Sequence, residues 1–365
     1  MTMRTILLNP GPVTLTDRVR NAMIKADWCH REPEFADLTK SINHRLANIY
    51  ESAAGEYSSV LMTGSGTLAV EAMLCSLAPV EDKTFVVANG VYGERMAAML
   101  TAMDRPFVTT DTSWDAPIDF DAVEKVLSIV PGITHIAAVH HETTTGRLND
   151  IARLAELCVK HDCALLLDAV SSFGSEEIRF RDWNLQAVAG TANKCLHGVP
   201  GLSFVVVDDK VLSEPNPRAG SVYLDLNRYY QTQHTDGYSP FTLAVQPAFA
   251  LDAALEEMAE AGGWKSRGAR YREVASSVRE TLRGLDIDTF IPEDEYSAVM
   301  CSYRLPAGTS YAALHDRLKA QGFIIYAGQG HFAEDMFRIA HMGAISDDDL
   351  ARLNDALTAF FHDAA

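Results

Sequence analysis

The chain has 365 residues, of which 47% are hydrophobic and 22% are charged, and its formal net charge is −18. This composition is typical of a globular protein with one or two domains. Because so acidic a chain repels phosphate backbones and anionic lipid, we expect neither a nucleic-acid nor a membrane partner. The six cysteines show no metal-binding spacing, so no metal site is expected. We find no signal peptide and no apolar run of about 18 residues, which predicts a cytoplasmic protein.

The first part of the chain alternates short apolar runs with helical segments. The predicted strands span residues 59–62, 84–87, 133–139, 164–167, 187–190 and 203–207. The predicted helices span residues 66–77, 93–103, 119–129, 150–160 and 239–261. Such alternation predicts an α/β fold in which helices cover both faces of a mostly parallel sheet.

The last part of the chain predicts a smaller α+β unit. Residues 214–237 are rich in Pro, Asn, Gly and Tyr and predict an irregular excursion, after which a helical stretch continues to about residue 284. Strands are predicted at 297–303, 324–326 and 336–339, and helices at 310–321 and 347–361. We therefore expect a large domain at residues 15–250 and a small C-terminal domain at residues 265–365, with residues 1–14 packing near the small domain.

A glycine-rich turn follows the first predicted strand and opens the first predicted helix. It consists of Gly64, Ser65, Gly66 and Thr67. A helix N-terminus presents unpaired N–H groups and the positive end of the helix dipole, and the two hydroxyls add donors. The turn is therefore a candidate phosphate site, although a plain strand-to-helix turn with capping residues has the same pattern.

Two ionisable residues follow neighbouring predicted strands. Asp168 ends an apolar run, at the sheet edge where ligands of open α/β sheets bind, and Lys194 lies 26 residues later in a Gly- and Pro-rich turn. A carboxylate can keep a pyridinium nitrogen protonated, and a lysine can bind a carbonyl group covalently. Alone, Asp168 could be a helix cap or an ion-pair partner, and Lys194 a solvated loop residue. Together they predict a pyridoxal 5′-phosphate (PLP) site.

These three features resemble the fold-type I PLP-dependent transferases, in particular the class V aminotransferases. The resemblance extends from the NPGP motif at 9–12 to the FRI motif at 337–339, nearly the whole chain. The HETTTG motif at 141–146 and the ANKC motif at 192–195, followed by GVPG at 198–201, are similar to the 2-aminoethylphosphonate–pyruvate transaminase family. The HREPEF segment at 30–35 departs from some members of that family and is closer to other class V members.

The resemblance implies a role for each matched residue. Lys194 corresponds to the Schiff-base lysine and Asp168 to the partner of the ring nitrogen, which makes them the expected catalytic residues. Further cofactor contacts are expected from Ser65, Gly66, Thr67 and Asn193 at the phosphate, Tyr92 on the ring face, Thr143 near the ring face or the 3-oxygen, and Thr242 at the phosphate of the partner subunit. Arg338 corresponds to the arginine that binds the acid group of the substrate, with Arg31 and Gly11 as further substrate contacts.

The implied activity is transfer of an amino group from 2-aminoethylphosphonate to pyruvate, in phosphonate degradation. The partners are then a small-molecule amine donor and pyruvate, and the resemblance implies a homodimer with composite active sites. Alanine– or serine–glyoxylate transamination stays open, because an arginine suits a carboxylate as well as a phosphonate. A cysteine desulfurase or another PLP lyase is the alternative of a different class. A desulfurase needs a mobile C-terminal cysteine, and the one cysteine there, Cys301, lies in a predicted strand.

Overall fold

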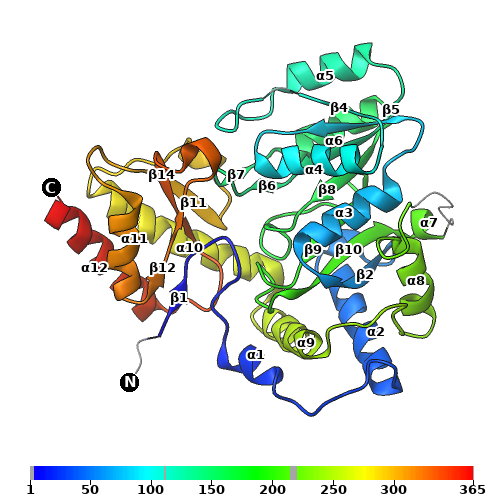
Figure 1. Ribbon diagram of the computed structural model, residues 1–365, viewed down its shortest axis with the longest axis horizontal. Helices are drawn as coiled ribbons and strands as arrows, with labels where there is room; N and C mark the ends of the chain where they lie inside the picture. The colour runs from blue at the N-terminus through cyan, green and yellow to red at the C-terminus, as the bar shows by residue number, and fades with distance from the viewer. Residues whose placement is uncertain (1–3, 111, 214–219, 365) are drawn as a thin grey trace.

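The computed structural model describes residues 4–110, 112–213 and 220–364. Its elements form two groups, which lie side by side in Figure 1. The larger group surrounds a seven-stranded sheet, and the smaller group surrounds a three-stranded sheet and holds the C-terminus. Residues 214–219, the first part of the segment predicted to be irregular, lie outside the described residues.

The large sheet has the strand order β2-β10-β9-β8-β5-β3-β4. Its strands are β2 (Tyr57–Gly64), β3 (Lys83–Val87), β4 (Phe107–Thr109), β5 (Ile133–Val139), β8 (Ala164–Asp168), β9 (Leu185–Thr191) and β10 (Gly201–Asp208). β10 is antiparallel to both of its neighbours, and the other neighbouring pairs are parallel. The predicted mostly parallel sheet is therefore confirmed. The short edge strand β4 was not predicted, because three residues carry little periodicity.

Helices cover both faces of this sheet, as predicted. One apolar cluster includes residues of α2 (Pro33–Ala47), α5 (Phe120–Ile129), α6 (Ile151–Lys160) and α9 (Val245–Glu260). A second cluster includes residues of α3 (Gly66–Leu77), α4 (Val91–Ala102) and α8 (Leu226–Thr235). Leu165 and Leu167 belong to the first cluster and Leu166 to the second, because successive side chains of a strand point to opposite faces. Burial on both faces explains the unbroken apolar run before Asp168.

Two predictions in the middle of the chain were wrong. The segment predicted to be irregular contains α8, whose Leu226 and Tyr229 are buried in the core although the rest of the helix is mostly polar. The helix predicted at 239–261 begins only at Val245. Pro240 disfavours helical backbone at the residue before it. The Ala244 N–H donates a hydrogen bond of 2.9 Å to Thr63 Oγ1 rather than continuing a helix.

The smaller group has the strand order β11-β14-β13, with both pairs antiparallel. Its elements are α10 (Gly263–Arg283), β11 (Met300–Arg304), α11 (Tyr311–Ala320), β12 (Phe323–Ile324), β13 (Tyr326–Ala327), β14 (Met336–Ala340) and α12 (Asp347–Ala364). The strand predicted at 324–326 is thus two short strands in different sheets. β12 pairs in parallel with β1 (Ile6–Leu7), which places the N-terminal segment beside the C-terminal elements (Figure 1). The domain boundaries at 15–250 and 265–365 stay a prediction.

Short elements complete the described chain. They are α1 (Asp17–Ala22), η1 (Glu51–Ala53), β6 (His141–Glu142), β7 (Arg147–Leu148), α7 (Asp209–Leu212), η2 (Glu293–Glu295) and η3 (Gly330–Phe332). β6 and β7 form a two-stranded antiparallel hairpin around the HETTTG motif.

Candidate active site

The residues predicted to bind the cofactor gather at one edge of the large sheet. β2, β3, β5, β8 and β9 run in the same direction, so their C-terminal ends lie along one edge. Ser65 follows β2, Tyr92 follows β3, Thr143 follows β5, Asp168 ends β8 and Lys194 follows β9. Five segments that are distant in the sequence therefore meet where open α/β sheets bind their ligands.

Asp168 presents a buried carboxylate at this edge. It is 6% exposed, and one of its oxygens accepts a hydrogen bond of 2.9 Å from the Val170 N–H. Burial raises the pKa of the Asp168 carboxyl, whereas the Val170 N–H and the charges of Lys194 and Arg95 lower it. A cationic N–H beside the carboxylate would favour its charged form further. The narrow cavity at Asp168 is also lined by Gly66, Thr67, Val70, Tyr92, Arg95 and Val170.

Lys194 approaches this cavity from the turn between β9 and β10. Its Nζ lies 5.8 Å from the centroid of the Tyr92 ring. The His197 N–H donates a hydrogen bond of 2.9 Å to the Lys194 carbonyl, which closes the turn. Lys194 is also close enough to Asp168 for its charge to lower the pKa of that carboxyl. The structure therefore brings the lysine, the carboxylate and the aromatic ring to one place.

Two residues shape the surroundings of Lys194. Gly11 has a φ of +106°, and a β-carbon added to it would lie 2.9 Å from Lys194 Cγ. Both the backbone conformation and the close approach favour glycine at this position. On the other side, Thr191 Oγ1 donates a hydrogen bond of 2.8 Å to Asn193 Oδ1. That bond orients the Asn193 amide, whose N–H groups point away from the oxygen and can act as donors.

The N-terminus of α3 forms the candidate phosphate site. Ser65 is the N-cap residue, and its side chain makes no capping hydrogen bond. Thr67 is exposed, and Arg95 Nη1 lies 3.5 Å from its hydroxyl. A β-carbon on Gly66 would lie 2.5 Å from a methyl group of Val170, so only glycine lets the helix begin this close to β8. Exposed hydroxyls, a helix N-terminus and a guanidinium together suit a phosphate group.

The HETTTG loop packs behind Tyr92. The Glu142 carboxylate accepts hydrogen bonds of 3.1 Å from the Thr144 N–H and 2.7 Å from the Thr144 hydroxyl. Glu142 is fully buried, and burial raises its pKa to about 7. Thr143 is 1% exposed, and within the described residues its hydroxyl has no hydrogen-bond partner. A buried hydroxyl without a partner fits the polar atom of a bound molecule.

Arg338 lies in β14, on the side of the site formed by the smaller group. It is 4% exposed; its Nε donates to the Ala327 carbonyl at 2.7 Å, and its Nη1 donates to the Thr143 carbonyl at 2.6 Å. Burial lowers the pKa of the guanidinium, but an arginine stays charged at physiological pH. It lines a cavity of about 440 Å³ together with Pro10, Tyr92, Tyr311, Tyr326, Ala327, Gly328, Gln329 and Gly330. Because Tyr92 lines both cavities, an acid group bound at Arg338 lies next to the Lys194 region.

These features fit pyridoxal 5′-phosphate. Asp168 offers a buried carboxylate for the ring nitrogen, Thr143 an unpaired hydroxyl for a ring oxygen, and Tyr92 a flat face for stacking. The first turn of α3 offers an anion site for the phosphate. Lys194 provides an amine 5.8 Å from the centroid of the Tyr92 ring. The arrangement can therefore bind an anionic ring compound, hold a proton on its nitrogen and move another proton with the lysine.

Comparison with known proteins agrees with this geometry. The family model described as aminotransferase class-V matches residues 21–344. The chain belongs to the aminotransferase class-V family. The 2-aminoethylphosphonate–pyruvate transaminase of Bacillus cytotoxicus is 34% identical over 355 residues, which are 97% of either chain. A bifunctional phosphonoacetaldehyde hydrolase/aminoethylphosphonate transaminase of Clostridioides difficile is 35% identical, and the match covers 98% of this chain but 56% of that longer protein.

Solved structures of other aminotransferases share the fold of this class V chain. The aspartate aminotransferase of Thermus thermophilus has a TM-score of 0.89 and 25% identity, covering 99% of this chain and 100% of the other. The alanine–glyoxylate aminotransferase of Nostoc sp. has a TM-score of 0.90 and 22% identity, covering 99% and 96%. At 22% identity, the similarity to the Nostoc structure shows a shared fold and nothing about activity. The predicted fold-type I architecture is confirmed.

Arg31 and Thr242 do not line either cavity of this class V chain. Arg31 Nη1 donates a hydrogen bond of 2.8 Å to the Ser239 carbonyl. Thr242 is exposed, and its carbonyl accepts a hydrogen bond of 3.2 Å from Thr63 Oγ1. The structure thus joins Arg31 to the segment that carries Thr242 rather than to Arg338. Contact of either residue with cofactor or substrate stays a prediction that depends on a second subunit.

Three polar residues at the site were not predicted from the sequence. Arg95 lies one helical turn after Tyr92, and its Cζ is 4.7 Å from the Tyr92 ring centroid; this i, i+3 spacing was an available signal. Glu142 lies inside the HETTTG motif but was given no role. Gln329 had no local signal, since only the fold brings its loop to Arg338.

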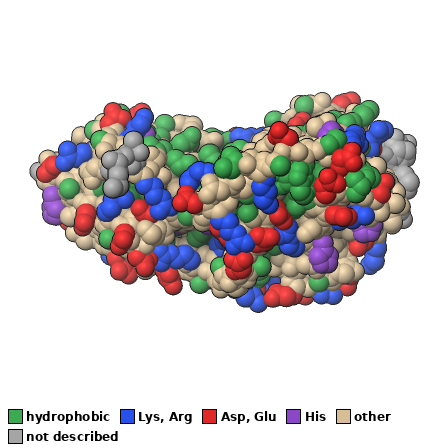
Figure 2. Space-filling view, turned by 90° about the horizontal axis from the view of Figure 1, so that it is seen from below, with side chains coloured by type: hydrophobic (Ala, Val, Ile, Leu, Met, Phe, Trp, Pro, Cys, Tyr) green, Lys and Arg blue, Asp and Glu red, His purple; other side chains and the backbone are tan. Residues whose placement is uncertain are grey.

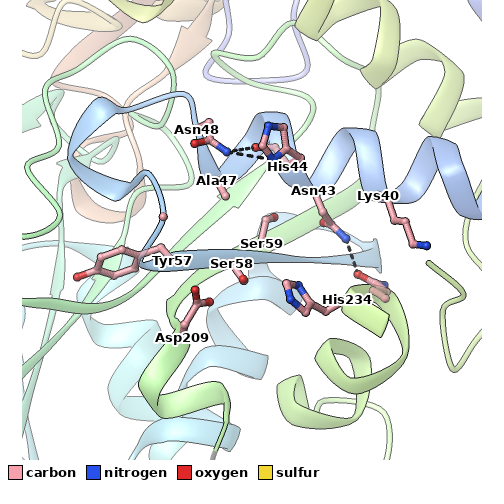
Figure 3. A pocket seen from close by; sticks show the side chains of 12 residues that line it. Lys40, Asn43, His44, Ala47, Asn48, Tyr57, Ser58, Ser59, Asp209 and His234 are labelled. Atoms are coloured by element: carbon pink, nitrogen blue, oxygen red, sulfur yellow. Dashed lines mark hydrogen bonds between the residues drawn. The ribbon is translucent and has the colours of Figure 1, made fainter. Parts of the chain in front are cut away.

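Another hollow, of about 390 Å³, lies at the opposite end of β2 (Figure 3). Lys40 and His44 of α2 line it together with Ser58 and Ser59 at the start of β2. The strand between Ser58 and the phosphate turn is roughly 20 Å long at its usual rise per residue. We therefore assign this hollow no part in the PLP site.

The excess negative charge does not form one patch on the face shown in Figure 2, where lysines and arginines lie among the acidic side chains. The two cavities of the site each have one arginine in their lining, Arg95 in one and Arg338 in the other. Of the helices in the described ranges, none is long and apolar enough to cross a membrane.

Proposed function

We propose that this class V aminotransferase transfers the amino group of 2-aminoethylphosphonate to pyruvate, giving phosphonoacetaldehyde and alanine. The observation that carries the proposal is the buried arginine, Arg338, in a cavity that adjoins the Asp168 and Lys194 region. Relatives that are 32–35% identical over nearly the whole chain have the name of this transaminase. Both substrates contain an acid group, and one arginine can bind a phosphonate and a carboxylate in turn.

Asp168, Lys194 and Arg338 have different roles in the proposed reaction. Pyridoxal 5′-phosphate, when bound, supplies an electron-poor ring that accepts the electron pair left by loss of a proton from the donor carbon. The Asp168 carboxylate holds the ring N–H and so preserves this capacity. Lys194 would hold the cofactor covalently, and its free Nζ would move the proton at the donor carbon. Arg338 fixes the acid group so that the reacting carbon faces Lys194.

We also propose a homodimer with composite sites. Thr242 is exposed, and the segment that carries it is tied to the end of β2 by two hydrogen bonds at Thr63 Oγ1. Thr63 immediately precedes the phosphate turn, so Thr242 lies on the surface beside it. A second subunit packed against this surface would bring its own Thr242 toward the phosphate, and Arg31 would move with that segment.

The alternatives are less well supported. A desulfurase needs an exposed, mobile nucleophile, but Cys301 lies in β11 with 0% exposure, and burial raises its pKa to about 11. Alanine–glyoxylate transamination uses the same cofactor machinery, and no contact at Arg338 favours it over the aminophosphonate reaction. A measurement of substrates is needed to separate these two.

The test is a matrix of amine donors and oxo-acid acceptors with the PLP-loaded protein. Donors are 2-aminoethylphosphonate, alanine and serine, and acceptors are pyruvate and glyoxylate, with the amino-acid product quantified. We expect 2-aminoethylphosphonate with pyruvate to give the highest kcat/KM. The Lys194→Ala protein serves as the inactive control. A clear preference for alanine with glyoxylate would overturn the substrate assignment and leave the PLP site intact.

A further inference from the structure

We propose that Gln329 is a second substrate-binding residue, whose side-chain amide binds the acid group beside Arg338 and favours phosphonate over carboxylate. This inference rests on the proposed function, because it specifies how the same site distinguishes the acid group of its substrate.

An arginine has five N–H donors, and three of those of Arg338 are occupied. Nε donates to the Ala327 carbonyl at 2.7 Å, and Nη1 donates to the Thr143 carbonyl at 2.6 Å and to Gln329 Oε1 at 3.4 Å. Among the described residues, the two N–H groups of Nη2 have no hydrogen-bond partner, so they remain for a ligand. Arg338 therefore offers one nitrogen rather than the two-pronged edge that usually binds an acid group. A phosphonate with three oxygens needs further donors.

Gln329 can supply them. Since the guanidinium can only donate, the oxygen of the Gln329 amide faces Arg338, and its Nε2 is the atom that remains to donate to a ligand. Gln329 and Arg338 line the same cavity of about 440 Å³. Among the described residues that line this cavity, Arg338 is the only charged one. The additional donors for a doubly charged phosphonate therefore have to be neutral, as an amide is.

The loop around Gln329 holds it in place. A β-carbon on Gly328 would lie 1.9 Å from the Phe332 carbonyl oxygen, and one on Gly330 would lie 2.7 Å from the Trp114 ring. The Phe332 N–H donates a hydrogen bond of 3.1 Å to the Gln329 carbonyl. Both neighbours of Gln329 are thus packed closely against other residues. A fixed backbone lowers the entropy cost of using this side chain to bind a ligand.

The experiment is calorimetric titration of the PLP-loaded protein with methylphosphonate and, separately, with acetate. Gln329→Glu keeps an oxygen for Arg338 but replaces the N–H donors with negative charge. We expect it to weaken methylphosphonate binding by about tenfold or more, the effect of losing a hydrogen bond to a charged group. Acetate binding should weaken less, because repulsion increases with the charge of the ligand. Gln329→Leu, which removes donor and acceptor without adding charge, should also weaken methylphosphonate more than acetate.

The matched control is Gln321→Glu, which adds the same charge at the end of α11, outside the cavity. Unchanged methylphosphonate binding in Gln329→Glu would overturn the inference, as would equal losses in Gln329→Glu and Gln321→Glu. A wild-type protein that does not bind methylphosphonate would overturn it too. A wild type that binds methylphosphonate through Gln329 but does not turn over the aminophosphonate would support this inference and reject the proposed function.

Discussion

Replacing Asp168 by Asn removes one negative charge from the site and leaves its shape almost unchanged. An asparagine oxygen can still accept the 2.9 Å hydrogen bond from the Val170 N–H, so β8 and the turn after it should keep their structure. A neutral amide, however, cannot stabilise a positively charged ring N–H. We expect kcat to fall by about 10²–10⁴-fold, the range of positioned proton-handling groups. This corresponds to about 3–5.5 kcal/mol on the barrier.

The assay measures alanine formation at saturating substrate, together with the visible absorbance of the bound cofactor. Asp82→Asn, at an exposed position before β3, removes the same charge elsewhere and should keep wild-type turnover. If Asp168→Asn kept near-normal turnover with cofactor bound, Asp168 would not be the partner of the ring nitrogen.

In the cofactor-free protein, Asp168→Asn should preserve or increase stability rather than cause a loss. Burial raises the pKa of Asp168 above its ordinary 3.8, so the folded state holds a proton that the unfolded state releases. The free energy of unfolding therefore decreases as the pH rises from 3.8 to the raised pKa of the folded state. Above that pKa, the wild type is destabilised by the full cost of burying the charged carboxylate. Asp168→Asn lacks the penalty and should be at least as stable as wild type at neutral pH, with the difference vanishing toward pH 4. Thermal unfolding of both cofactor-free proteins checks this, and a less stable variant at neutral pH would contradict it.

Three further predictions concern the surroundings of the cofactor. Lys194→Ala should abolish the visible absorbance of the attached cofactor, and borohydride reduction of the wild type followed by peptide mapping should label Lys194 and no other lysine. Gly11→Ala should reduce cofactor occupancy and turnover at least tenfold, because its β-carbon would approach Lys194 Cγ at 2.9 Å and its φ is +106°; wild-type absorbance would refute the close approach. The protein should sediment as a dimer, and Thr242→Ala should raise the Kd of the cofactor without changing that size. A fully active monomer would rule out composite sites.

Sequence patterns predicted the large sheet well because its signals are local. Both faces of the strands are buried, which leaves unbroken apolar runs such as the one before Asp168. The connection rules of parallel sheets then place the ends of these runs at one edge. That is why Asp168 and Lys194 could be placed together from spacing and residue type, whereas the turn after β2 was added by the family resemblance.

The features that sequence patterns did not predict have non-local causes. α8 is a polar helix that is fixed by packing Leu226 and Tyr229 onto the sheet, and packing can override weak local propensity. The position of Arg31 depends on the carbonyls of Ser239 and Pro240, more than 200 residues away. Gln329 reaches Arg338 only because β13 and β14 pair. Contacts of this kind leave no periodic trace in a single sequence.

The HETTTG motif links the two halves of the site. Arg338 donates to the Thr143 carbonyl at 2.6 Å, Ser302 Oγ donates to the Thr145 carbonyl at 2.5 Å, and the Ser297 N–H donates to the Gly146 carbonyl at 3.0 Å. Three carbonyls of one loop are thus held by residues of the C-terminal part of the chain, while the buried Thr143 hydroxyl has no hydrogen-bond partner among the described residues. Arg338 therefore joins the acid-binding cavity to the backbone of this loop. The motif is thus connected to that cavity by a direct hydrogen bond, although none of its residues lines it.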